Sequence, residues 1–175
     1  KKARFIAELG LSEYDASLLI DNQELAAFFE SGLEKNKAYA KKLSNWLTGE
    51  YYRLQNIHAI PLKELKFNAQ DIIKIIELVD TQKVSSTNAK VIFEELFTNG
   101  GNPATIMKDK GLEQITDSGA VENAVKKVIG EQPKAVSDYK GGKETVMQFL
   151  VGMVMKELKG KGNTEEIRTI LKDNL

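Results

Sequence analysis

Cysteine is absent from this chain of 175 residues, and histidine occurs once, as His58. The lack of cysteine excludes disulfides and thiolate metal ligands, and it agrees with a reducing compartment. A single histidine excludes the usual zinc sites and a Ser-His-Asp triad, so we expect His58 to lie at the surface or cap a helix. Lysine and arginine balance aspartate and glutamate at 25 each, so the whole chain does not attract a polyanion.

A long apolar run is also missing. No stretch approaches the ~20 apolar residues that cross a membrane, and no signal peptide is present. We therefore predict a soluble, cytoplasmic protein without a membrane partner. Because the chain opens with Lys1-Lys2 rather than Met, we also expect a fragment of a longer protein.

Apolar residues recur at helical spacing along the whole chain, whereas alternating β-branched runs are missing. The longest predicted helix runs roughly from Lys37 to Asn56. Beyond Gly111 the predicted helices become shorter, and glycines and lysines become denser. The sequence therefore predicts an all-α fold with two small helical bundles in tandem, residues 1–110 and 112–175.

Polar residues ahead of apolar runs predict where helices begin. Ser12 and Asn68 are predicted N-caps, and Asp21 with Glu24 resembles a capping box. Asn163 is predicted to cap the last helix. In the second helix, Tyr14 is predicted to face inward together with its leucines.

The segment from Gly141 to Gly162 places an apolar helix between two clusters of glycine and lysine. A Walker phosphate loop is excluded, since Glu144 follows Lys143 where that loop needs Ser or Thr, and no correctly spaced glycine precedes it. The apolar run is also too short to span a bilayer. We therefore expect a helix buried on several sides, with Gly152 allowing close approach of a neighbouring helix.

Lysines and glycines in the last third of the chain are candidates for RNA contact. Exposed glycines would let backbone N–H groups approach a sugar-phosphate chain, and lysines would bind its phosphates. On the residues alone, an ordinary solvated surface is the favoured explanation of these charges. The candidate RNA-binding residues are Lys126, Lys127, Lys134, Lys140, Gly141, Gly142, Lys143, Lys156, Lys159 and Lys161.

No residue pattern indicates catalysis within this chain. The adjacent carboxylates Glu94 and Glu95 are expected to point to different sides of a helix, and no carboxylate pair must share a site. We therefore predict no catalytic residue, no metal ligand and no bound cofactor in this chain.

Several motifs resemble the GatB/YqeY family. They are QITD at Gln114, PKAVSDYKGGK at Pro133 and FLVGMVMK at Phe149, which resemble the tail of GatB from the aspartyl/glutamyl-tRNA amidotransferases and the stand-alone YqeY proteins. Thr164 stands where the family commonly has proline, and both residues suit the first turn of a helix.

The resemblance extends upstream. LSNWLTGEYYRLQN at 43–56 is similar to an Asn-Trp, Gly-Glu helix of the family. RFIAELGLSEYDASLLI at 4–20 is similar to the GatB segment that leaves the catalytic cradle, so residues 1–27 favour GatB over YqeY, which lacks that segment.

The resemblance implies a function for the longer protein. GatB works with GatA and GatC, and its cradle uses ATP and Mg²⁺ to amidate Glu-tRNA(Gln) and, in many organisms, Asp-tRNA(Asn). The region resembling this chain would be non-catalytic and would position the tRNA, not DNA. Two alternatives stay open: a stand-alone YqeY-like binding protein, and a structural helical domain that meets only protein partners.

Overall fold

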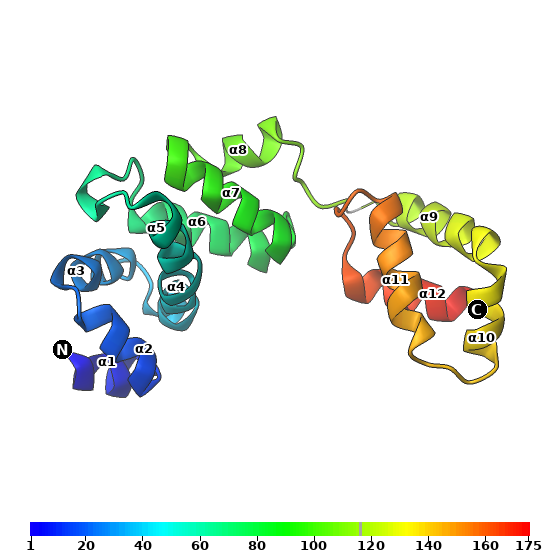
Figure 1. Ribbon diagram of the computed structural model, residues 1–175, viewed down its shortest axis with the longest axis horizontal. Coiled ribbons are helices and arrows are strands. Elements are labelled where there is room, and N and C mark those ends of the chain that lie inside the picture. The colour runs from blue at the N-terminus through cyan, green and yellow to red at the C-terminus, as the bar shows by residue number, and fades with distance from the viewer. Residues whose placement is uncertain (116) are drawn as a thin grey trace. The chain divides into compact units, whose positions relative to one another are not determined.

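The computed structural model describes residues 1–115 and 117–175, so Thr116 of the QITD motif lies outside the described residues. All regular structure within those residues is helical, which confirms the predicted all-α fold (Figure 1). The chain divides into two compact units. The first unit contains Lys1–Asp80 and Ala89–Lys110, and the second contains Thr81–Asn88 and Gly111–Leu175.

Short helices follow one another closely up to Lys110. In chain order they are α1 (Lys2–Leu9), α2 (Glu13–Ile20), α3 (Gln23–Gly32), η1 (Lys37–Tyr39), α4 (Ala40–Trp46), η2 (Leu47–Tyr51), α5 (Tyr52–His58), η3 (Leu62–Glu64), α6 (Ala69–Asp80), α7 (Ser86–Asn99) and α8 (Pro103–Asp109). Aromatic rings meet edge to face in the first unit's core, with centroids 5.1 Å apart for Phe5 and Phe29 and 5.7 Å apart for Phe67 and Phe93. Such contacts add to the gain from burying the rings.

Two predicted N-caps of the first unit are confirmed. The Ser12 hydroxyl accepts a hydrogen bond of 3.0 Å from the N–H of Asp15. Asn68 Oδ1 accepts from the N–H of Asp71 at 3.2 Å, while Asp71 Oδ2 accepts from the N–H of Asn68 at 3.0 Å. This reciprocal pair satisfies N–H groups that the first turn of α6 leaves without helical partners.

Two local predictions were wrong. The cap of α3 is Asn22 rather than Asp21, since Asn22 Oδ1 accepts from the N–H groups of Glu24 and Leu25, while Asp21 keeps helical dihedrals at the end of α2. Tyr14 is 71% exposed rather than inward. Ala16 and Leu19 carry the buried face of α2, so Tyr14 lies on its other side.

The long helix predicted from Lys37 to Asn56 is present, but it changes its winding along the way. η1 is a 3₁₀ turn, α4 is regular, η2 is a π-helical turn and α5 ends at His58. Ala59 then takes left-handed dihedrals, with φ 52°, and its N–H donates to the carbonyl of Gln55. π turns insert extra residues into a helix and are frequent at functional sites.

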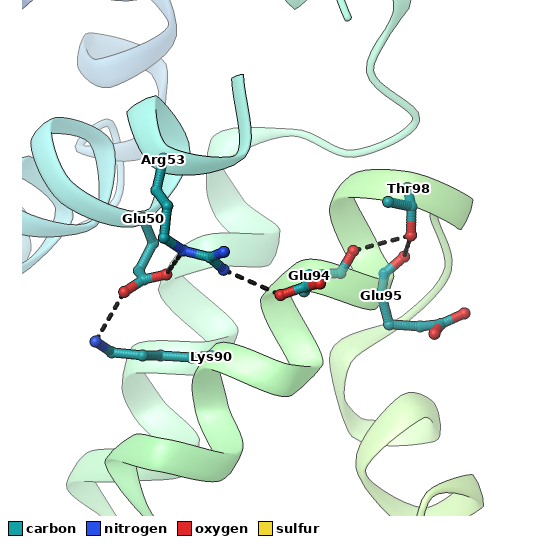
Figure 2. A network of polar contacts seen from close by, with 6 residues as sticks. All are labelled: Glu50, Arg53, Lys90, Glu94, Glu95 and Thr98. Atoms are coloured by element: carbon teal, nitrogen blue, oxygen red, sulfur yellow. Dashed lines mark hydrogen bonds and ion pairs between the residues drawn. The ribbon is translucent and has the colours of Figure 1, made fainter. Parts of the chain in front are cut away.

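Glu50, on the π turn, holds η2 and α5 to α7 (Figure 2). Its side chain is 15% exposed, and its two oxygens accept from Lys90 Nζ at 2.7 Å and Arg53 Nε at 2.8 Å. Arg53 Nη2 also donates to Glu94 at 3.0 Å. Burial by itself raises the pKa of Glu50, but hydrogen bonds from Lys90 and Arg53, together with their charges, hold that pKa below its ordinary value.

We expect Glu50→Gln to lower the free energy of unfolding by about 1 kcal/mol at pH 7, because the neutral amide loses two charge-assisted hydrogen bonds. Because the folded-state pKa is depressed, this stabilisation is present above the ordinary glutamate value of 4.5 and is lost as pH falls through the folded value. Urea denaturation at pH 7 and below pH 4.5 measures the difference.

Glu94→Gln is the matched control, since Glu94 belongs to the same network but is 54% exposed. It should cost less than about 0.5 kcal/mol at any pH. Equal losses for both variants would contradict the role given to Glu50.

The second unit is built around one long apolar helix. Its helices are α9 (Ser118–Glu131), α10 (Pro133–Lys140), α11 (Val146–Glu157) and α12 (Thr164–Asn174). α11 packs against the other three, as predicted for a helix buried on several sides (Figure 1). Its core residues Leu150, Val151 and Val154 are almost fully buried with side chains of α9 and α12.

The N-cap predicted for the last helix of the second unit is confirmed. Asn163 caps α12 as predicted, since its Oδ1 accepts from the N–H groups of Glu165 and Glu166. α9 runs past Gly130 to Glu131, and Pro133 then begins α10.

The turn between α6 and α7 belongs with the second unit, whereas the predicted boundary placed it in the first. The N–H of Gln114 donates to the carbonyl of Lys83 at 2.7 Å. Val84, in the same turn, is 1% exposed. This backbone contact joins residues about thirty positions apart, so local sequence patterns could not predict it.

Candidate nucleic-acid interface

The candidate lysines lie mainly at the two ends of α11. Lys140, Gly141, Gly142 and Lys143 form the turn before α11, which we call the first basic corner. The residues 156–161 end α11 and begin the turn to α12, and we call them the second basic corner. Because α11 has 12 residues at about 1.5 Å rise each, the corners are roughly 18 Å apart. The lysines therefore form two separate groups rather than one compact patch.

The first basic corner presents side chains rather than backbone donors. Its N–H groups are already used: Gly141 donates to Ser137 at 2.9 Å, Gly142 to Tyr139 at 2.9 Å and Lys143 to Asp138 at 3.1 Å. These bonds satisfy the last carbonyls of α10, which explains the glycine with φ 95° at 142. The prediction that glycine N–H groups here approach a phosphate is therefore wrong.

The lysines of this corner are open to solvent. Lys143 is 66% exposed and lies 3.4 Å from Asp138, a loose ion pair. Lys140 is also exposed. A Cβ added at Gly142 would meet nothing within 4 Å, so another molecule can come close to the chain at this point.

The second basic corner has an open part and a buried part. Gly160 is open, with nothing within 4 Å of an added Cβ, but its N–H donates to the carbonyl of Met155. Gly162 is buried, and a Cβ there would lie 2.6 Å from Ile167 Cδ1 and 2.8 Å from Leu158 Cδ1. Gly162 is therefore needed for packing rather than for contact with a phosphate. Lys161 is half-buried, and its carbonyl accepts from the N–H of Ile115.

The two lysines of α9 are engaged within the chain. Lys126 pairs with Glu122 at 2.9 Å, and Lys127 pairs with Glu157 at 2.6 Å. The hydrogen bond to Glu157 raises the pKa of Lys127. Among the residues that the structure describes, the candidates without an ion pair are Lys134, Lys140, Lys156, Lys159 and Lys161.

Sequence reasoning missed two cations on α12. Arg168 and Lys172 line a cleft of about 440 Å³ together with Tyr139, Glu144 and Gln148. Arg168 Nη2 donates to Gln148 Oε1 at 3.3 Å, and its Nη1 lies 3.4 Å from a carboxylate oxygen of the exposed Glu165. The spacing of four residues between Arg168 and Lys172 places both on one side of a helix and was the available signal.

Gly152 does not play the part predicted for it. It is exposed, and an added Cβ would meet nothing within 4 Å, so no described helix of the second unit approaches it closely. The neighbours of α11 cover other sides of the helix. Gly152 instead lies on its open side, with Phe149 and Lys156.

Other predicted features can be placed as well. His58 is exposed in the last turn of α5, and its ring centroid is 5.8 Å from that of Phe97. Glu94 and Glu95 diverge as expected, toward Arg53 and Lys110. Among the described residues, no group of three acidic or histidine side chains could hold a metal ion, and no helix is both long and apolar enough to cross a membrane.

We expect slow amide exchange at Gly141, Gly142 and Lys143, by at least about tenfold relative to an unstructured chain, because each N–H is bonded to a carbonyl of α10. Exchange measured by NMR at neutral pH checks this. Adding inorganic phosphate should leave their amide shifts in place. Fast exchange, or large phosphate-induced shifts, would restore the view that these N–H groups bind anions.

The fold and the site define a class of protein: two tandem all-helical units, of which the second exposes lysines at both ends of one apolar helix. The family model described as the GatB domain matches residues 27–175. Since this is most of the chain, the chain belongs to the GatB domain family.

Curated relatives match the chain over nearly its whole length. They are named as B subunits of aspartyl/glutamyl-tRNA(Asn/Gln) amidotransferase. The protein from Thermoanaerobacter sp. (strain X514) is 44% identical over 176 residues, that from Caldanaerobacter subterraneus subsp. tengcongensis 43% over 175, and that from Clostridium botulinum (strain 657 / Type Ba4) 39% over 173. These matches cover 99–100% of this chain but only 36–37% of each relative.

Proposed function

We propose that this chain is the C-terminal region of GatB in an amidotransferase, and that its second unit binds tRNA and positions it. The observation that supports the first part is the match to relatives of that name across the whole chain. The match includes residues 4–20, the segment that YqeY proteins lack. This favours GatB over a stand-alone YqeY-like protein.

The supporting observation for tRNA binding is the set of exposed ammonium groups in the second unit. The chain has no net charge, so long-range attraction has to come from such local groups. Lys134, Lys140, Lys156 and Lys159 are exposed without an ion pair among the described residues. Each can therefore bind a phosphate without first breaking a contact within the protein.

Lysine contacts of this kind position an RNA but do not read its bases. An ammonium group is a point charge, so it recognises the path of the phosphates rather than the sequence. In the proposed enzyme, such contacts hold the tRNA body while its charged 3′ end reaches a distant catalytic site. Orientation of reactants can lower a barrier by several kcal/mol, so a non-catalytic unit can still affect the rate.

The remaining parts of the proposal concern the whole enzyme. GatB would work with GatA and GatC, and its catalytic part would use ATP and Mg²⁺ to convert Glu-tRNA(Gln), with Asp-tRNA(Asn) as a second substrate. In this proposal the ammonia comes from glutamine.

Replacing four exposed lysines by glutamine tests tRNA binding. The changed residues are Lys140, Lys143, Lys156 and Lys159. We expect the affinity for a tRNA(Gln) transcript to fall at least about tenfold near 0.1 M salt, because each lost phosphate contact reduces the slope of log K against log salt by about 1. Filter binding at several salt concentrations measures both quantities, and circular dichroism checks that the variant is folded.

The control replaces four exposed lysines of the first unit, which changes the net charge equally. They are Lys35, Lys63, Lys66 and Lys108. This variant should keep most of the affinity and the slope. If it loses as much as the first variant, binding is not a property of the two basic corners.

A further inference from the structure

The described residues of the second unit leave one side of α11 uncovered. Thr145, Phe149, Gly152 and Lys156 follow one another at spacings of four, three and four residues, which places them in one row along the helix. All four are exposed, and Phe149 keeps 49% of its surface. We call this row the open face of α11. It runs from the first basic corner to the second.

Among the described residues of the second unit, none requires a glycine in the middle of this face. Gly152 lies inside a regular helix, its φ is not in the left-handed region, and an added Cβ would have free space. Alanine is the better helix former, so glycine here weakens the helix without a gain in packing. Gly130 also has free space around an added Cβ, so what distinguishes Gly152 is its place between Phe149 and Lys156. Without a side chain, Gly152 lets another molecule come close to the helix at that point.

The charges around the open face favour RNA as that molecule. Lys143 precedes the face, and Lys156 and Lys159 lie at its end. Of the acidic neighbours, Glu157 is bound to Lys127, while Glu144 is exposed and lines the cleft with α12 together with Thr145. A half-exposed aromatic ring between cations is the arrangement that binds unstacked nucleotides, because the ring stacks on a base while the cations hold phosphates.

We propose that a sugar-phosphate strand of RNA crosses the open face of α11 at Gly152, with Phe149 against a base or ribose and Lys143 and Lys156 on flanking phosphates. The proposal rests on the tRNA-binding function proposed above. It adds a path for the RNA strand between the two basic corners, which lie at opposite ends of α11. It also adds an apolar contact to what would otherwise be binding by charge alone.

Gly152→Ala is the decisive variant, because it should change stability and binding in opposite directions. The added methyl favours the helix, so the melting temperature should rise or stay the same. The same methyl holds the RNA strand away from the helix, so the affinity for a tRNA(Gln) transcript should fall about tenfold, which corresponds to about 1.4 kcal/mol.

Gly130→Ala is the matched control. Gly130 is also exposed, lies in a helix of the same unit and has nothing within 4 Å of an added Cβ. It should affect stability in the same direction but leave tRNA affinity unchanged. Phe149→Leu is a second variant, which keeps an apolar side chain but removes the stacking ring and should also weaken binding about tenfold.

The outcomes separate this inference from the function on which it rests. If the unchanged protein does not bind tRNA, the proposed function fails and this inference fails with it. If the lysine variant loses binding but Gly152→Ala and Phe149→Leu do not, the function stands and the open face is not the route. If these two variants instead abolish self-association measured by size-exclusion chromatography, with tRNA binding intact, the face docks a protein and the inference is overturned.

Discussion

Burial of α11 on several of its sides underlies the arrangement of the second unit. Leu150, Val151 and Val154 place apolar surface toward α9 and α12, and α10 covers part of the remainder. Since apolar contact is non-directional, it needs the turns at both ends of α11 to set where the neighbouring helices lie. Those turns carry the glycines and lysines. Burial of α11 therefore forms the core of the second unit and also places the charged residues at the two ends of one helix.

The electrostatics of the chain are local. Because the chain has no net charge, an ammonium group attracts a polyanion effectively only where no carboxylate lies beside it. The structure sorts the lysines in this way, since those of α9 are paired with Glu122 and Glu157 whereas Lys156 and Lys159 point into solvent without an ion pair among the described residues. Glu50 in the first unit shows the opposite use of charge, because its bonds to Arg53 and Lys90 join parts of the same unit.

Prediction from the sequence worked where a local interaction decides the outcome. Ser12, Asn68 and Asn163 cap helices as their positions indicate, since a cap bonds to N–H groups two or three residues away. Prediction of the cap failed for Asp21, because Asn22 is an equally good cap one residue later. Which of two adjacent caps is used depends on where the preceding helix ends, and that is set by packing.

The glycines show most clearly where prediction from the sequence fails. The sequence marks 152 and 162 alike, yet Gly162 lies against Ile167 and Leu158 while Gly152 has open space around it. Similarly, the glycines at 141 and 142 suggested free N–H donors, and the structure shows these groups bonded to carbonyls of α10. The sequence by itself determined the helices, three of their caps and the family, because these follow from neighbours along the chain and from residue order. Only the tertiary structure decided which lysines are free, which glycines are buried and which side of α11 is open, because these depend on segments brought together from distant positions.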